Sequence, residues 1–103
     1  MRKAEVFLLG IRAGLLEELE PHSAYRFTYD PHYSGPPVSL TMPIQDKAYA
    51  FNRFPPFFEG LLPEGYNLDA LLRACKIDRH DLFSQLVAVG ADTVGAVTVQ
   101  EIA

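Results

Sequence analysis

The chain has 103 residues, of which 49% are hydrophobic and 21% charged, a composition typical of a globular protein. Its formal charge of −4 and pI near 5.2 argue against independent binding to nucleic acid or to an anionic membrane. No apolar run approaches the roughly 20 residues that cross a bilayer, and the N-terminus has no secretory pattern, so we expect one cytoplasmic domain over residues 1–103.

The first part of the chain predicts strands. Residues 4–9 predict a first strand, and Gly10 and Gly14 bracket a turn that returns through a second strand at residues 15–16. In residues 25–30, aromatic side chains alternate with Arg, Thr and Asp, so one face of this third strand would be buried.

Two further segments alternate in the same way. Residues 38–42 alternate apolar and polar side chains between prolines, which predicts a short edge strand. Residues 96–102 place Val97 and Val99 opposite polar neighbours and predict a final strand.

A helix is predicted after residue 66, in a region that contains no proline. Asn67 is suited to cap its N-terminus, and an apolar stripe at helical spacing follows, made of Leu68, Leu71, Leu72 and Cys75. Cys75 is the only cysteine, which excludes an internal disulfide, and we expect it to be buried on this face, with a reactive thiol as the alternative.

A second helix is predicted to begin at the cap residue Asp78, with Asp81 in its first turn, and to end at Gly90. Its buried side chains would be Leu82, Phe83, Leu86 and Val87. The predicted fold class is therefore α+β: a small antiparallel β-sheet with two short helices in the C-terminal half.

Catalytic patterns are scarce. His22, His32 and His80 lack metal-ligand spacing, and we interpret them as solvated surface residues. No nucleophile elbow, zinc motif or Walker loop is present, so we predict no catalytic residue, no metal and no cofactor. An unrelated small enzyme remains the alternative.

Two polar patterns have simple structural interpretations. Residues 90–95 contain two glycines but lead into a strand, which favours a turn closed by Asp92 over a phosphate-binding loop. The acidic side chains of Glu17, Glu18 and Glu20 are interpreted as a solvated face.

The segment PPFFEGLLPEGY, residues 55–66, is unusually apolar for a loop. Its prolines argue against a regular helix or a central strand, and loops normally run over the surface. Packing inside the domain would account for some of its apolar side chains, and for the phenylalanines this is a close alternative. We nevertheless predict a partner-binding face made of Phe57, Phe58, Leu61, Leu62, Pro63, Glu64, Gly65 and Tyr66.

The order of these segments resembles the N-terminal domain of HipA-type serine/threonine kinases, the toxins of bacterial toxin–antitoxin operons. The similar stretches are VFLLGIRAGLL (6–16), YRFTYD (25–30), VSLTMPI (38–44), FPPFFEGLLPEG (54–65) and DLFSQLVAVGADTVGAV (81–97). Three positions depart from the family pattern: Leu9 replaces a turn asparagine, Pro55 an arginine and Gly60 an asparagine.

The resemblance implies a partner rather than a reaction. In a full HipA-type kinase this domain precedes the nucleotide-binding and catalytic part, and HipS-type proteins are free-standing versions that bind and neutralise a shortened kinase, HipT, in HipBST systems. Met1 and a complete set of sheet elements favour the free-standing form. The implied partners are a HipT-like kinase and a HipB-like DNA-binding subunit, without direct contact to nucleic acid or membrane.

Two alternatives to neutralisation remain open. One is a structural subunit that completes the kinase without inhibiting it, and the other is an excised fragment of a full-length kinase. Tyr66 carries the sharpest hypothesis: it either enters the partner's cleft or packs as a hydrophobic staple on its own helix near residue 71.

Overall fold

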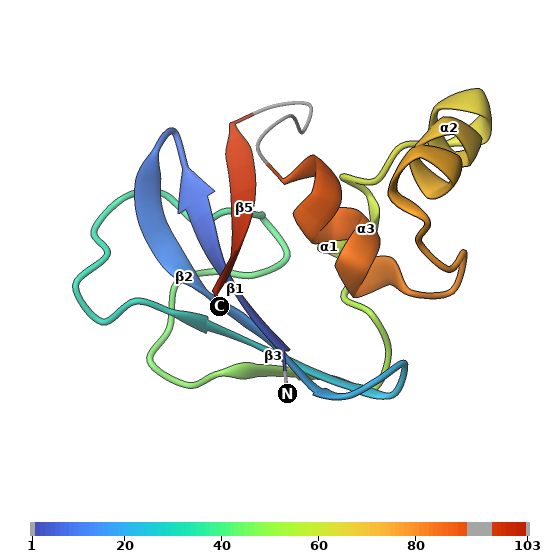
Figure 1. The fold of residues 1–103 in the computed structure, drawn as a ribbon. Coiled ribbons are helices and arrows are strands. Elements are labelled where there is room, and N and C mark those ends of the chain that lie inside the picture. The colour runs from blue at the N-terminus through green and yellow to red at the C-terminus, as the bar shows by residue number, and fades with distance from the viewer. Residues whose placement is uncertain (1, 91–95, 103) are drawn as a thin grey trace.

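The computed structural model describes residues 2–90 and 96–102, and it confirms the α+β class. Within these residues the chain forms one five-stranded antiparallel sheet, in the order β4-β3-β2-β1-β5, with three helices (Figure 1). The elements are β1 (Arg2–Leu8), β2 (Ile11–Glu20), β3 (Ala24–Tyr29), β4 (Tyr49–Phe51), α1 (Pro56–Glu59), α2 (Gly65–Cys75), α3 (Leu82–Val89) and β5 (Val97–Ile102).

β1 and β2 form a hairpin with a two-residue turn. Leu9 (φ 51°) and Gly10 (φ 81°) both adopt positive φ, the conformation that gives a hairpin turn the twist of its strands. The register shifts between Val6 and Phe7, and β2 runs for ten residues, much longer than the predicted return at 15–16. The strands predicted at 4–9, 25–30 and 96–102 are confirmed with small shifts at their ends.

The last strand lies against the first. β5 pairs with β1 from Lys3↔Ile102 to Leu8↔Val97, so the two ends of the described chain meet at one side of the sheet. Gly90, just after α3, accepts a hydrogen bond from the Val99 amide at 2.9 Å. A Cβ at position 90 would lie 1.9 Å from the Val99 carbonyl oxygen, so glycine is required for this close approach.

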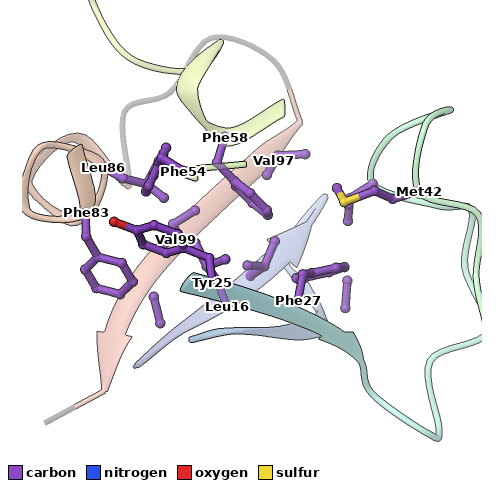
Figure 2. Packing of buried hydrophobic residues seen from close by; sticks show 14 of the residues in the cluster. Leu16, Tyr25, Phe27, Met42, Phe54, Phe58, Phe83, Leu86, Val97 and Val99 are labelled. Carbon is purple, nitrogen blue, oxygen red and sulfur yellow. The ribbon is translucent and has the colours of Figure 1, made fainter. Parts of the chain in front are cut away.

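The core lies between one face of the sheet and the helices α1 and α3. Figure 2 shows Phe58 projecting from α1, with Phe83 and Leu86 from α3, toward Leu16 and Phe27 of the sheet. All five side chains are fully buried. The Phe27 and Phe58 rings are 5.6 Å apart, which joins the sheet directly to α1.

The predicted edge strand at residues 38–42 is wrong. This segment forms only an isolated bridge between Ser39 and Met42, and the edge strand beside β3 is β4. The reason is a side chain: the Tyr29 hydroxyl accepts the Val38 amide at 3.1 Å and donates to the Met42 carbonyl. The Val38 amide and the Met42 carbonyl are thus bonded to Tyr29 rather than to a neighbouring strand.

The helices differ from the prediction in number and at their starts. The part of the chain described here contains three helices, and the additional one is α1. It can begin at Pro56 because the amide that proline lacks would be unpaired at the first position of a helix in any case. α2 begins at Gly65 with Glu64 at its N-cap, so Asn67 is not the cap. α3 is capped by Asp81, which accepts the Ser84 amide at 3.1 Å, and not by Asp78.

Cys75 is exposed, contrary to the prediction that it is buried. The helical stripe exists, but no residue of α2 is buried, since the helix lies beside α3 and away from the sheet (Figure 1). The apolar spacing therefore predicted the helix correctly, whereas the stripe is half-buried at Leu68, Leu71 and Leu72 and exposed at Cys75. The predicted turn at residues 90–95, with Asp92, lies outside the described residues beyond Gly90.

The solvated acidic face is also partly wrong. Glu17 and Glu18 are 5% and 4% exposed, whereas Glu20 is exposed. Each buried carboxylate has a cationic partner from another part of the chain: Arg26 Nε donates to Glu17 at 2.9 Å and Arg2 Nε to Glu18 at 2.8 Å. Paired charges can be buried where isolated ones cannot.

Candidate functional site

The predicted partner-binding segment divides into a buried and an exposed part. Phe58 is fully buried in the core, and Phe57, Leu61 and Leu62 are half-buried and pack against it. The Phe57 and Phe58 rings meet edge to face at 5.2 Å. These four side chains hold α1 and the chain that follows it against the body of the molecule, so their packing role is established by the structure.

The remaining four residues form a projecting turn, which we call the Tyr66 corner (residues 63–66). Pro63 is half-buried, and Glu64, Gly65 and Tyr66 are exposed. Gly65 has a positive φ of 58°, a conformation that glycine adopts without strain, and nothing lies within 4 Å of the place where its Cβ would be. The corner is therefore a sharp, open bend at the start of α2.

Tyr66 is the most exposed aromatic side chain of this segment, with 93% of its surface accessible. A hydrophobic staple would cover its own helix and lose much of that surface. The geometry of the described residues therefore favours a displayed side chain over a staple. The half-buried Leu61 and Leu62, which precede Tyr66 in the chain, pack against the core and hold the backbone that leads to it.

A partly buried ionic network joins the first strand to α3, and the sequence interpretation missed it. Glu18 accepts hydrogen bonds from Arg2 Nε at 2.8 Å, Arg2 Nη2 at 3.0 Å and the Tyr25 hydroxyl at 3.1 Å. Arg2 Nη2 also donates to Asp81 at 2.8 Å, and its guanidinium lies 4.8 Å from the centre of the Phe83 ring. Glu18 and Asp81 lie 16 and 79 positions from Arg2 in the sequence, so no local pattern predicts that these side chains meet.

The network shifts the pKa values of its members. Hydrogen bonding to Glu18, opposed by burial, raises the pKa of Arg2. Burial raises the pKa of Asp81, but hydrogen bonds from Arg2 and from Ser84 outweigh it and lower that pKa to about 2. Asp81 is thus a charged cap that holds α3 to β1 throughout the neutral range.

A hollow lies beside this network. It is open, about 670 Å³ in volume, and is lined by Arg2, Glu18, Leu19, Pro21, His22, Asp78, His80 and Asp81. Its charged groups Arg2, Glu18 and Asp81 are engaged with one another. Among the described residues, no three His, Cys, Asp or Glu side chains gather to hold a metal ion, and no helix is long and apolar enough to cross a membrane.

Comparison with known proteins identifies the fold and the family. The family model described as the HipA N-terminal domain matches residues 4–100. The chain belongs to the HipA N-terminal domain family. The solved structure of an "N-terminal domain of HipA toxin" superposes with a TM-score of 0.77 at 31% identity, covering 100% of this chain and 94% of that one.

Two relatives of the HipA N-terminal domain family differ in length. An uncharacterized protein of Haemophilus influenzae is 37% identical over 101 residues, 98% of this chain and 93% of that protein. The serine/threonine-protein kinase toxin HipA of Shewanella oneidensis is 35% identical over 74 residues, 72% of this chain but 17% of the kinase. The chain thus corresponds to a small, noncatalytic portion of a HipA kinase and is a HipA-related toxin–antitoxin component.

Proposed function

We propose that the chain is a HipS-like antitoxin, a single domain over residues 1–103 that acts in the cytoplasm by binding and neutralising a shortened HipA-like serine/threonine kinase. It has no catalytic role of its own in this proposal. A HipB-like DNA-binding subunit is a candidate third member of the complex. The relation to the HipA N-terminal domain family and the near-complete coverage of a small relative support the proposal.

The observation that carries the proposal is the display of Tyr66. An aromatic side chain that is 93% exposed stabilises nothing in the free chain, since it buries almost no apolar surface there. Tyrosine is among the residues that contribute most to protein interfaces, because it buries a large area and has few rotatable bonds. Because Tyr66 lies at a bend and projects into solvent, we expect it to be the first residue of the predicted partner-binding segment to meet a partner.

The buried members of that segment support the exposed ones. Phe58 anchors α1 in the core, and Leu61 and Leu62 pack against the same cluster, so the chain entering the Tyr66 corner is held in place. Holding the residues before the corner in advance lowers the entropy that these residues lose on docking, whereas Tyr66 itself belongs to the first turn of α2. In our proposal Tyr66 enters the cleft where the kinase would hold nucleotide or substrate, within an interface of roughly 1,200–2,000 Å².

The test is co-expression with a shortened HipA-like kinase. The unaltered chain should restore growth to cells that express the kinase, and the two purified proteins should elute together on size exclusion at micromolar concentration. Tyr66→Ala should weaken neutralisation and binding by about 2 kcal/mol, roughly a thirtyfold rise in Kd. Its melting temperature should be nearly unchanged, because the ring is exposed.

Leu40→Ala is the matched control. Leu40 is 94% exposed, so its truncation removes an equally accessible apolar side chain away from the Tyr66 corner. It should leave both stability and neutralisation unchanged. A complex that forms without suppressing toxicity would support a structural subunit instead. Full neutralisation by a folded Tyr66→Ala chain would show that the wrong residue has been chosen.

A further inference from the structure

α2 is held to the rest of the molecule by half-buried side chains alone, with Leu68, Leu71 and Leu72 forming its covered stripe. None of its eleven residues is buried, whereas the shorter α3 buries Phe83, Gln85 and Leu86. Half-buried apolar side chains elsewhere in the described residues pack against the core, but none of these belongs to α2. Helical stability in proteins comes mainly from packing an apolar face, and the face of α2 is less completely covered than that of α3.

The two ends of α2 are incompletely stabilised, although the Ile77 amide donates to the Leu72 carbonyl at 3.1 Å beyond the C-terminus. At the N-terminus, Glu64 has the extended backbone of a cap residue (φ −128°, ψ 162°), but its side chain makes no capping hydrogen bond. At the C-terminus, Lys76 adopts the left-handed conformation (φ 54°, ψ 46°), which favours glycine and costs energy for a residue with a Cβ. The N-terminus of α3 is better satisfied, since Asp81 accepts the Ser84 amide.

The side-chain hydrogen bond that links α2 to the following loop is on the surface. Arg79 Nη2 donates to Asp69 Oδ1 at 2.7 Å, and the two side chains are 59% and 42% exposed. Water screens an ion pair this exposed, so its contribution to docking is small. An isolated helix of eleven residues is itself marginal in water.

We propose that α2 is a separate, weakly stable unit, which unfolds locally in the free chain while the sheet and α3 remain folded, and which becomes ordered when the kinase binds. Three features lower the stability of α2: it has no fully buried residue, its N-cap makes no side-chain hydrogen bond, and its C-cap is a lysine in the left-handed conformation. The second half of this inference rests on the proposed function, because Tyr66 lies in the first turn of α2 and any partner that takes up its ring also contacts that turn.

Hydrogen exchange of the free, full-length chain tests the first half. Peptides from α2 should exchange at least about 100-fold faster than those from β1 and β2, relative to unstructured controls at the same pH. Exchange of α2 at the rate of the sheet would overturn the proposal. This measurement needs no partner and is independent of the proposed function.

Lys76 offers a variant outside the predicted partner-binding residues. Lys76→Gly removes the Cβ from a left-handed position and should slow exchange of α2 at least about threefold, with exchange of β1 and β2 unchanged. Lys76→Ala is the matched control, because it removes the same charge but keeps the Cβ, and it should not slow exchange. Equal effects of the two substitutions would overturn the role assigned to this C-cap.

Adding the kinase tests the second half. On saturation, α2 should become protected by at least tenfold, and Lys76→Gly should bind the kinase more tightly than Lys76→Ala, since less ordering remains to be done. A stable complex in which α2 still exchanges fast would overturn ordering on binding and leave the antitoxin proposal standing. Absence of a complex would refute the antitoxin proposal and also the ordering of α2 by this kinase. Local unfolding of α2 in the free chain would still be decided by hydrogen exchange without the kinase.

Discussion

Replacing Arg2 with methionine should destabilise the fold by breaking the ionic network from its cationic centre. Arg2 donates to Glu18 and to Asp81 and lies over the Phe83 ring. Methionine keeps an unbranched apolar chain against that ring, so the substitution removes the charge and hydrogen bonds more than the packing. What remains is Glu18, 4% exposed, with the Tyr25 hydroxyl as its hydrogen-bond partner in the network.

The expected cost follows from burial. Removing one partner of a buried ion pair costs roughly 3–5 kcal/mol, because the other charge is left uncompensated. Arg2 is 34% exposed, so water can partly replace it, and we expect about 2–3 kcal/mol. For a domain of about 100 residues this corresponds to a fall in melting temperature of roughly 10–20 °C.

Urea unfolding at neutral pH should be measured for Arg2→Met, Glu18→Gln and the double variant. In the double variant the buried charge is gone, so its free energy of unfolding should exceed that of Arg2→Met by about 1 kcal/mol or more. The reasoning would be refuted if Arg2→Met cost less than about 1 kcal/mol, or if the costs of the two substitutions simply added.

Three further predictions concern single positions. Leu9→Asn should raise the free energy of unfolding by about 1 kcal/mol, because Asn tolerates the positive φ of Leu9 in a turn before glycine, whereas Leu9→Ala, which keeps the strain, should not. Gly90→Ala should destabilise by about 2 kcal/mol or more in thermal melts, since its Cβ would lie 1.9 Å from the Val99 carbonyl oxygen; a neutral effect would mean that α3 can shift away from β5. The folded-state pKa of Asp81, near 2, is below its ordinary value of 3.8, so its contribution to stability should be present above pH 4 and be lost as pH falls toward 2. Asp81→Asn should flatten that part of the acid-unfolding curve, and an unchanged curve would contradict the assignment.

The strands were predictable where the pattern is local. The alternation in residues 25–30 places Tyr25, Phe27 and Tyr29 on one face, and these side chains are buried as expected. The full length of β2 was not predictable, because its acidic run looks like a solvated face. Glu17 and Glu18 are buried because Arg26 and Arg2 supply the opposite charge. The pairing of the strands in the sheet brings these arginines to the carboxylates.

The helices show a different limit. Helical spacing identified α2, but spacing alone cannot show how much of the apolar stripe a neighbour covers. The prediction that Cys75 is buried failed for this reason. At α3 two aspartates could serve as the cap, and Asp81, which accepts the Ser84 amide, also contacts Arg2, a partner that the local sequence does not reveal. The prolines of α1 argued against a helix, although Pro56 is compatible with a first turn.

The candidate site was located by composition and only partly resolved by it. The apolar residues of the 55–66 segment were identified, but the sequence could not separate Phe58, which is fully buried, from Tyr66, which is 93% exposed. That division depends on where the chain bends. Gly65 marks the bend, and its positive φ was not specified by the pattern around it.

The pairing of β1 with β5 sets the order in which the molecule is completed during synthesis. β1, β2 and β3 are neighbours in sequence and can associate early, but one edge of β1 stays open until β5, near the other end of the chain, has left the ribosome. An unpaired strand edge attracts other chains. In a crowded cell, nascent copies halted before β5 should therefore be the aggregation-prone species, and a short peptide with the sequence of β5 should compete for the same edge.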